Sequence, residues 1–366
     1  MTAPGSAASP DVVVIGDGLI GLAVAVALAD AGARVHLLGA REPGQASHAA
    51  AGMLAPGVER AEGPAHDFAR LARDRHPAFA AALLARTGID VGLDRRGILQ
   101  VALTTAQAQA LRGTVAGDAR WLDASALARL EPALAHAAGG VLHPEDGAVD
   151  NRRLLAALAA IVAAHPAVEW LPGRAAALEL AADHAAVRTS TGERHAAARV
   201  VLAAGAWSAT LAGLPRPLPV EPVRGQMLAV AATPLRHVVY GPAGYLVPRA
   251  DRTLVGSTME RVGFDARTTA AALAGVRAAG GAICPALLAA AELERWAGLR
   301  PVTPDGLPIL GPDPAHPALL YATGHSRNGV LLAPLTGECI AALAGGRPAP
   351  ADLGPFRVER FDRSGR

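Results

Sequence analysis

The feature that most constrains the fold is a glycine-rich turn near the start of the chain. The motif GDGLIG, residues 16–21, follows the β-branched run Val12–Ile15 and opens an apolar segment that reads as a helix. Gly32 stands where that helix would end, and Arg34–Leu38 reads as a second strand. Glycines at this spacing allow a tight turn and let the backbone approach a pyrophosphate at the helix N-terminus. The segment therefore predicts a βαβ unit that binds a dinucleotide.

One part of this binding pattern is missing at the end of the second strand. A carboxylate at that point normally accepts the ribose hydroxyls, but this chain has Gly39 there. Glu42 lies close enough in sequence to replace the acid, and Arg41 could do so in another way. The gap lowers the expected affinity without removing the pyrophosphate site.

The rest of the chain mixes α/β segments with antiparallel strands. Residues 150–164 read as a helix and residues 199–208, RVVLAAGAWS, as a buried strand ending in small residues. Residues 96–142 and 220–297 instead carry alternating strands, and YLVPR and TLVGSTM flank a hairpin-like turn at residues 250–252.

These segments predict an α/β fold (α+β overall), with a Rossmann-like nucleotide-binding domain and an inserted antiparallel-sheet substrate domain. The nucleotide-binding domain is expected to be discontinuous, over residues 11–92, 146–218 and 297–366. The substrate-binding domain is expected over residues 93–145 and 219–296. Residues 1–10, rich in Ala, Ser, Pro and Gly, are expected to be disordered.

The composition excludes several classes of function. The formal net charge is +2, which favours neither nucleic acid nor an anionic membrane. The chain contains no lysine, which excludes Schiff-base and P-loop chemistry. The two cysteines, Cys284 and Cys339, form no CxxC pair, and no two histidines lie three or four residues apart, so no metal site is expected.

The sequence also indicates a cytoplasmic protein. No basic residue precedes Arg34, so a signal peptide would lack its charged region. The apolar run Leu19–Ala29 is too short to span a bilayer. The scarcity of cysteine suits a reducing compartment.

Two further stretches indicate which dinucleotide is bound. SHAAAGML, residues 47–54, is rich in small residues that let the backbone approach a flat ring. RVVLAAGAWS brings a second glycine-bearing strand end towards the same cofactor. A packed small-residue loop would explain either stretch alone, but the combination favours an extended FAD over NAD.

At this point the chain resembles the FAD-dependent D-amino acid oxidase superfamily, and within it the glycine oxidases of thiamine biosynthesis. The resemblance runs from residue 11 to about residue 340, so it covers nearly the whole chain. It rests on VVVIGDGLIG, SHAAAGML, VLAAGAWS, GYLVPR, VGSTME, RWAGLRPVTPDGLPILG and ATGHSRNGVLLAP.

The resemblance implies non-covalent FAD, because the PDGLPILG region has no cysteine and Cys339 falls in the last helix. It also implies that the helix starting at Gly329 faces the pyrimidine end of the flavin, where its N–H groups and dipole stabilise negative charge. The implied cofactor-binding residues are Gly16, Gly18, Leu19, Ile20, Gly21, Ala51, Gly52, Met53, Ala175, Ala204, Gly205, Trp207, Asn328, Gly329, Val330 and Leu331.

The resemblance also implies a substrate site built around Arg300. A guanidinium binds a carboxylate with two hydrogen bonds, and Tyr245 would help to hold the same carboxylate. Met259 matches a pocket residue but could be core filler, and Arg327 could serve the pocket mouth or the flavin. His325 could act as a base, although a loop histidine more often caps a helix.

The activity implied is oxidation of glycine, or another small amine, to its imine, with O₂ reduced to H₂O₂. The imine would supply synthesis of the thiamine thiazole, and relatives suggest a homo-oligomer. A small residue, Ser326, precedes Arg327, so sarcosine and small D-amino acids stay open as substrates of an oxidase or a dehydrogenase. A flavin-binding subunit without turnover is the alternative from another class.

Overall fold

The computed structural model describes residues 10–59, 62–181 and 183–362. The chain forms two compact units, each built from separate segments. Unit 1 comprises residues 1–42, 155–221 and 301–366, and unit 2 comprises residues 43–154 and 222–300. The disorder expected for residues 1–10 falls, up to residue 9, outside the described residues.

A six-stranded sheet forms the centre of unit 1, in the order β18-β19-β12-β1-β2-β8. The five strands from β19 to β8 are parallel, and β18 pairs antiparallel with β19 at one edge. Residues 12–15 of β1 are all buried, as expected for a strand covered on both faces. The described elements of this unit are β1 (Val12–Ile15), α1 (Leu19–Asp30), β2 (Val35–Gly39), β8 (Val168–Pro172), β9 (Ala175–Leu180), β10 (Ala185–Thr189), β11 (Arg194–Ala197), β12 (Arg199–Leu202), β18 (Ile309–Pro312), β19 (Leu319–Thr323) and α9 (Gly329–Ala344), with the 3-10 turns η2 (Gly205–Thr210), η4 (Gly354–Phe356) and η5 (Val358–Phe361).

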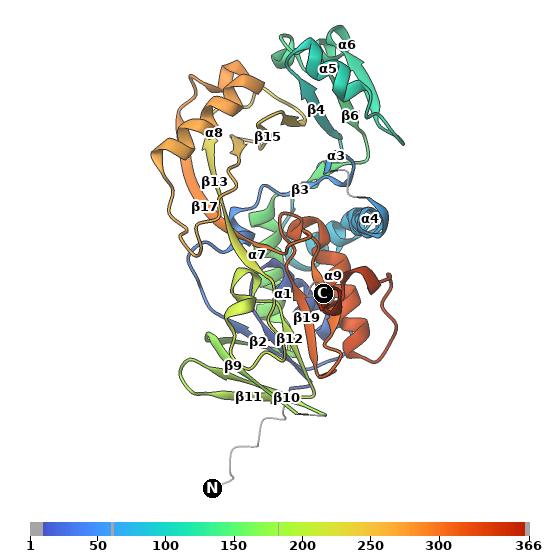
Figure 1. Cartoon of the computed structure of the whole chain (residues 1–366), viewed down its shortest axis with the longest axis vertical. Helices are drawn as coiled ribbons and strands as arrows, with labels where there is room; N and C mark the ends of the chain where they lie inside the picture. The colour runs from blue at the N-terminus through green and yellow to red at the C-terminus, as the bar shows by residue number, and fades with distance from the viewer. Residues whose placement is uncertain (1–9, 60–61, 182, 363–366) are drawn as a thin grey trace. The chain divides into compact units, whose positions relative to one another are not determined.

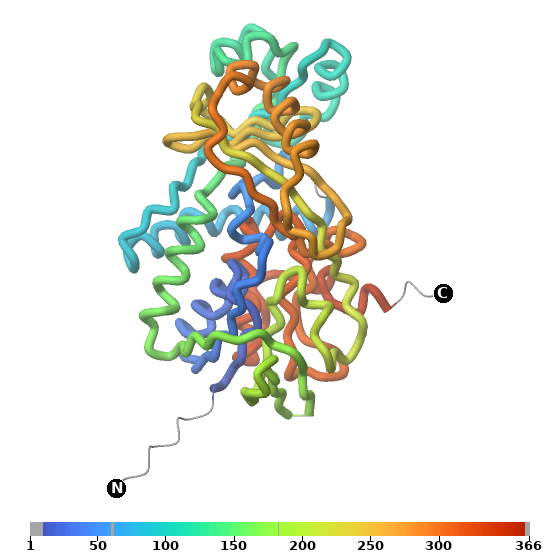
Figure 2. Tube along the Cα trace, turned by 90° about the vertical axis from the view of Figure 1, so that its left-hand side faces the viewer, coloured from blue at the N-terminus to red at the C-terminus, as the bar shows by residue number. Residues whose placement is uncertain are grey.

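Helices α1 and α9, which lie far apart in the sequence, pack against each other in unit 1 (Figures 1 and 2). A Cβ on Gly337 of α9 would lie 2.8 Å from the carbonyl oxygen of Ala23 in α1, so only glycine allows this approach. Strands β9, β10 and β11 form a separate antiparallel sheet in the order β11-β10-β9.

An eight-stranded sheet forms the centre of unit 2, in the order β17-β13-β16-β15-β14-β4-β6-β5. Strand β14 is parallel to β4, whereas β15, β16, β6 and β5 each pair antiparallel with their neighbours. The other described elements are α2 (Ala46–Ala49), β3 (Met53–Leu54), α3 (Pro56–Glu59), α4 (Gly63–Thr87), β4 (Ile98–Ala102), α5 (Thr105–Arg112), β5 (Arg120–Asp123), α6 (Ala124–Leu130), η1 (Pro132–Leu134), β6 (Gly139–His143), β7 (Gly147–Ala148), β13 (Glu221–Val230), β14 (Val238–Gly241), β15 (Gly244–Pro248), β16 (Thr253–Gly256), α8 (Ala270–Ile283), η3 (Pro285–Leu287) and β17 (Glu292–Val302). Helix α7 (Asn151–Ala164) begins in unit 2 and continues into unit 1.

The predicted fold class is confirmed, with a Rossmann-like parallel core and separate antiparallel sheets. The compact units divide the chain differently from the predicted domains, because residues 43–92, 146–154 and 297–300 fall in unit 2 and residues 219–221 in unit 1. Within that unit, Gln45 forms a bridge with Leu299, and β3 pairs with β7. Which ligand each unit binds stays a prediction.

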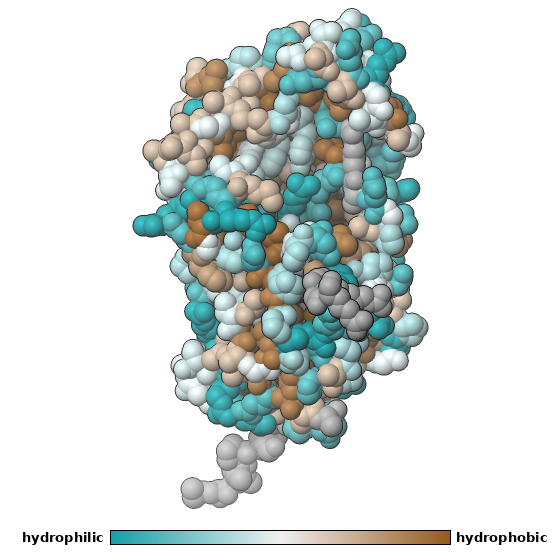
Figure 3. Space-filling model, in the orientation of Figure 1, coloured by the Kyte–Doolittle hydropathy of each residue, from teal (hydrophilic) through white to brown (hydrophobic). Residues whose placement is uncertain are grey.

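No helix among the described residues is long and apolar enough to cross a membrane. The face drawn in Figure 3 mixes hydrophilic and hydrophobic residues.

Candidate cofactor and substrate site

The glycine turn of unit 1 is too crowded for any side chain. Gly16 has a φ of +107°, and a Cβ on it would overlap the carbonyl oxygen of Ala203. A Cβ on Gly21 would overlap the carbonyl oxygen of Gly16 itself. The glycines are therefore required by the contact between the turn, α1 and the end of β12. Gly18, Leu19 and Ile20 complete this turn and open the helix.

The second strand end predicted for the cofactor lies beside this turn. Strand β12 pairs with β1 in parallel, and the N–H of Ala203 donates to the carbonyl oxygen of Ile15 at 2.9 Å. A Cβ on Gly16 would lie 3.1 Å from the Cα of Ala204. Gly205 and Trp207 follow in the 3-10 turn η2. Thus the two glycine-bearing strand ends meet within unit 1.

The helix start at Gly329 is an open N-terminus. Its N-cap residue, Asn328, makes no side-chain capping hydrogen bond, and the first turn holds no acidic residue. Val330 and Leu331 are buried in that turn, whereas Arg327 before it is exposed. The start of α9 therefore carries neither a side-chain cap nor an acidic charge, which suits an anionic ligand.

His325 is a structural residue of this segment. It is 3% exposed, and its Nε2 lies 3.1 Å from the hydroxyl oxygen of Thr336 in α9. Burial lowers the pKa of His325 to about 3, so the imidazole is neutral. Its carbonyl oxygen accepts from the N–H of Asn328 at 2.8 Å. The ring bonds to the middle of α9 and not to the N–H groups of its first turn, so His325 packs the segment against the helix and does not cap it.

Ala175 is the first residue of β9. It packs at the edge of the apolar core beneath the parallel sheet. The neighbouring Arg174 holds Glu42 in an ion pair, with 3.0 Å between Nη1 and Oε1. The contact of Ala175 with the cofactor stays a prediction.

Unit 2 holds Arg300 in one fixed orientation. Its Nη2 donates to the hydroxyl of Ser257 at 2.7 Å, and its Nη1 donates to the carbonyl oxygen of Thr258 at 3.1 Å. The guanidinium lies against the backbone of Gly225, where an added Cβ would come within 2.5 Å of its Cζ. These two bonds leave Nε and one hydrogen on each terminal nitrogen for a ligand.

Tyr245 reaches the same short segment from strand β15. Its ring covers Gly256, where an added Cβ would come within 2.5 Å of the hydroxyl oxygen, and its hydroxyl lies 3.5 Å from the sulfur of Met227. Because Gly256 directly precedes Ser257, the phenol and the guanidinium of Arg300 contact consecutive residues. Both predicted carboxylate-binding residues therefore contact the segment 256–258. Met259, one residue further, is 62% exposed and so is not core filler.

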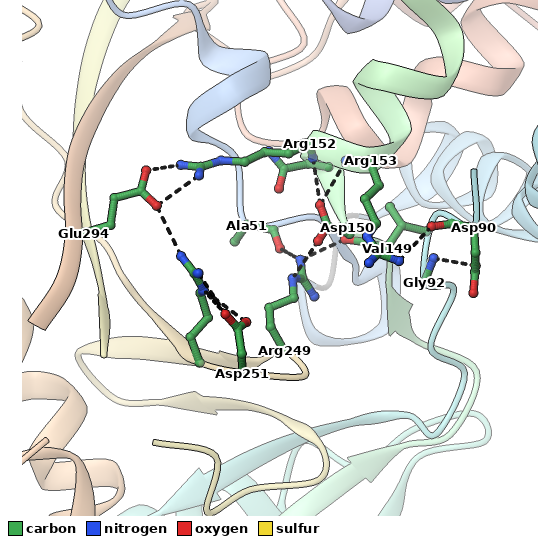
Figure 4. A network of polar contacts seen from close by, with 12 residues as sticks. Ala51, Asp90, Gly92, Val149, Asp150, Arg152, Arg153, Arg249, Asp251 and Glu294 are labelled. Carbon is green, nitrogen blue, oxygen red and sulfur yellow. Dashed lines mark hydrogen bonds and ion pairs between the residues drawn. The ribbon is translucent and has the colours of Figure 1, made fainter. Parts of the chain in front are cut away.

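Arg249 fixes the small-residue segment at the other end of strand β15, and it was not singled out from the sequence. Its Nη2 donates to the carbonyl oxygens of Ala51 at 2.8 Å and Val149 at 2.9 Å (Figure 4). Between these acceptors Gly52 has a φ of +80°, and a Cβ there would overlap the carbonyl of Val149. Met53 follows in β3 and is half-buried. Arg249 thus ties the segment 51–53 to the strand that carries Tyr245.

Replacing Arg249 with glutamine is expected to lower the free energy of unfolding by about 2–4 kcal/mol. The change removes a largely buried cation and leaves two main-chain carbonyls without their donor. The matched control is Arg252→Gln, in the same hairpin, whose guanidinium pairs with Asp251 at the surface. Chemical denaturation should show a loss of about 1 kcal/mol or less for the control. Equal losses in the two variants would contradict the proposed anchoring.

Comparison with known proteins identifies the family. The model of the DAO family, FAD dependent oxidoreductases, matches residues 11–343. The chain belongs to this family. Glycine oxidase of Geobacillus kaustophilus is 36% identical over 96% of this chain and 97% of its own length. A crystal structure of glycine oxidase from that organism has a TM-score of 0.89, at 34% identity over 96% of this chain and 99% of that one.

Two other similar proteins extend the comparison within the DAO family. The bifunctional protein ThiO/ThiG of Synechocystis sp. is 37% identical over 96% of this chain, which spans only 54% of that relative's length. The structure of iminodiacetate oxidase from Chelativorans sp. BNC1 has a TM-score of 0.88, at 28% identity over 95% of this chain and 98% of that one.

The residues of unit 1 fit the FAD that this family uses. Neither α1 nor α9 has a side-chain cap or an acidic residue in its first turn, so both helix starts can donate to an anionic group. Cys339 is fully buried within α9, and Cys284 is buried in unit 2, where burial raises the pKa of its thiol. Neither sulfur offers an exposed thiolate, which agrees with non-covalent FAD.

Asp146 supports the segment that follows β3 in this FAD-dependent oxidoreductase. Its carboxylate is 1% exposed and accepts from the N–H groups of Gly57 at 3.0 Å and Val58 at 2.9 Å. A guanidinium nitrogen of Arg73 lies 3.9 Å from its Oδ1. Burial outweighs these contacts and raises the pKa of Asp146 to about 6.

This raised pKa predicts a pH-dependent stability. Because the folded pKa lies above the unfolded value of 3.8, the folded protein holds more protons between these pH values. The stability contributed by Asp146 is therefore lost as the pH rises from about 4 to about 6. Thermal unfolding at pH 4.5 and 7 should show that Asp146→Asn removes this loss. In the control Asp74→Asn, at an exposed carboxylate beside Arg73, the loss should stay. If the thermal stability of the wild type and both variants depended on pH in the same way, Asp146 would not be the group responsible.

Most site residues that the sequence missed lie inside motifs that it did show. Ser257 and Thr258, which hold Arg300, belong to VGSTME. Arg249 ends YLVPR. An arginine placed directly after a strand that carries a site residue is a usable signal, but its acceptors at Ala51 and Val149 are far away in sequence.

Proposed function

We propose that this chain oxidises glycine to its imine with bound FAD, and that O₂ is reduced to H₂O₂. The observation that carries the proposal is the guanidinium of Arg300 held by Ser257 and Thr258, with Tyr245 against the adjoining Gly256, because a guanidinium and a phenol suit a small carboxylate. Membership of the DAO family and the similarity to named glycine oxidases support the same reading.

Each group of residues has a separate role in this proposal. When bound, FAD supplies the redox chemistry by accepting the hydride equivalent of the amine and passing its electrons to O₂. Unit 1 would hold the pyrophosphate at the start of α1 and the pyrimidine end at the start of α9. Arg300 and Tyr245 would hold the substrate carboxylate, which fixes the position of the α-carbon.

The protonation states of the proposed site residues fit a neutral amine substrate. His325 is buried, and burial lowers the pKa of its imidazole to about 3, so it is too weak a base to take a proton from the substrate at physiological pH. Hydride transfer from an unprotonated amine requires orientation rather than a base. The residues proposed for the site therefore bind and orient; none has to move a proton.

The substrate range is proposed to extend to other small amines. The similar iminodiacetate oxidase is named for a secondary amine, which favours sarcosine as a second substrate. Small D-amino acids are a further option, since Ser326 and Gly244 are small. Delivery of the imine to the thiamine thiazole rests on the ThiO/ThiG relatives, of whose length this chain spans about half. A cytoplasmic location and a homo-oligomer stay predictions.

The deciding experiment is anaerobic mixing of the purified, FAD-loaded protein with glycine, sarcosine, iminodiacetate and D-alanine. We expect glycine to bleach the flavin absorbance near 450 nm, and air to restore it with release of H₂O₂. Bleaching by sarcosine alone would move the assignment to that substrate. Bleaching without reoxidation by air would indicate a dehydrogenase. Bound flavin that none of these amines bleaches would indicate a subunit without turnover.

A further inference from the structure

The structure shows what stands at the place of the missing ribose-binding acid. In dinucleotide-binding folds this acid ends the second strand, where its carboxylate accepts the ribose hydroxyls. Strand β2 ends here at Gly39, which has no side chain. The N–H of Gly16 donates to the carbonyl oxygen of Leu38 at 2.8 Å, so the end of β2 lies directly beside the glycine turn.

The side chain of Asp17, in the middle of that turn, occupies the space next to Gly39. A Cβ added to Gly39 would lie 2.5 Å from the Cγ of Asp17 and 2.8 Å from its Cβ, and would overlap its Oδ2. Strands β1 and β2 are adjacent and parallel, with Ile15 opposite Leu38, which brings the two residues together. A side chain at position 39 and an aspartate at position 17 therefore exclude each other.

The carboxylate of Asp17 is available to a ligand. It is half-buried, and neither of its oxygens has a hydrogen-bond or ion-pair partner among residues 10–59, 62–181 and 183–362. Glu42, the acid that the sequence offered as a replacement, already forms its ion pair with Arg174. Arg41 is exposed, and as a cation it cannot accept hydrogen bonds from ribose hydroxyls.

We infer that Asp17 has taken over the role of the ribose-binding acid, and that its carboxylate accepts the hydroxyls of the adenosine ribose of FAD. The glycine turn thus supplies both the phosphate-binding backbone and the acid that other dinucleotide-binding folds place on β2. Such O–H···O⁻ bonds are among the stronger ones because the acceptor is charged. The inference rests on the proposed position of FAD at this turn.

The dissociation constant of FAD, measured on the apoprotein by quenching of flavin fluorescence, tests the inference without catalysis. Asp17→Asn keeps the shape of the side chain and removes its charge, and should weaken FAD binding about 10-fold or more. Glu42→Gln should stay within about 2-fold of the wild type. FMN, which lacks the adenosine ribose, should bind the wild type and Asp17→Asn equally, whereas a general disturbance of the turn would weaken both flavins.

A double variant tests the exchange of positions directly. Gly39→Glu alone should bind FAD more weakly than the wild type, because two carboxylates would share one space. Asp17→Gly combined with Gly39→Glu returns the acid to the end of β2 and should bind FAD more tightly than Asp17→Gly alone. If the wild type binds FAD and Asp17→Asn binds it equally well, this inference is wrong and the proposed function stands. If the wild type binds no FAD, both fall.

Discussion

Replacing Arg300 with alanine is expected to raise the KM for glycine at least about 100-fold while FAD stays bound. The guanidinium would form a charge-assisted, bidentate hydrogen bond with the substrate carboxylate in a partly buried site. Losing such an interaction weakens the binding free energy by about 3–5 kcal/mol. Ser257 and Thr258 hold the guanidinium before substrate arrives, so little is lost in ordering it. Steady-state kinetics of H₂O₂ release, with the flavin spectrum recorded on the same sample, measure both effects.

The control for this variant lies on the same strand. Arg295 of β17 is exposed and pairs with Glu292, so Arg295→Ala should change the KM for glycine by less than about 2-fold. Arg300→Lys should fall between the wild type and alanine, because an ammonium keeps the charge but not the planar fork. A KM unchanged in Arg300→Ala would refute the carboxylate-binding role. Loss of FAD in that variant would show a role in the fold instead.

Sequence patterns predicted the parts of the fold that depend on interactions between residues close together in the chain. The glycine turn, its helix and both flanking strands need only contacts that are close along the chain, and the structure has β2 at Val35–Gly39 where residues 34–38 were expected. The hairpin around residues 250–252 is confirmed by the pairing of β15 with β16. Both follow from turn chemistry and from the period of the apolar residues.

Helices α4 and α8 were missed although both are rich in alanine, because each contains residues that disfavour a helix interior. Helix α8 is rich in alanine and glycine and lies in a stretch expected to be strands, where its capping residue Thr269 was the available clue. Helix α4, Gly63–Thr87, contains Pro77, which argues against a helix interior. The tertiary contacts of each helix decided the outcome, and a single sequence does not show them.

The candidate site divides in the same way. The resemblance to the family suggested Arg300, whose role stays a proposal, whereas motif spacing predicted the glycine turn with Gly16 and Gly21. Motif spacing could not predict that Asp17 fills the space beside Gly39. That space exists only because Gly39 has no side chain, and Asp17 reaches it from the neighbouring strand end. A glycine where a charge is expected is therefore a reason to look for the charge on the adjacent element.

Replacing Gly21 with alanine is expected to weaken FAD binding at least about 100-fold. The added methyl would overlap the carbonyl oxygen of Gly16 and lie 2.8 Å from its carbon, and neither backbone atom can move aside as a flexible side chain could. The turn and the start of α1 must then separate, which costs about 1–3 kcal/mol in packing and moves the helix donors away from the pyrophosphate. Fluorescence titration of the apoprotein with FAD gives the dissociation constant.

A matched glycine in the same unit separates this effect from a general loss of stability. Gly345, just after α9, has a φ of −85° and no atom closer than 3.4 Å to an added Cβ, so Gly345→Ala should bind FAD as tightly as the wild type. The Gly21→Ala protein should also unfold at a lower temperature, but by only a few degrees for a chain of this size. Tight FAD binding in Gly21→Ala would show that the close contact between the turn and α1 is dispensable, and the cofactor would then have to be placed elsewhere in the chain.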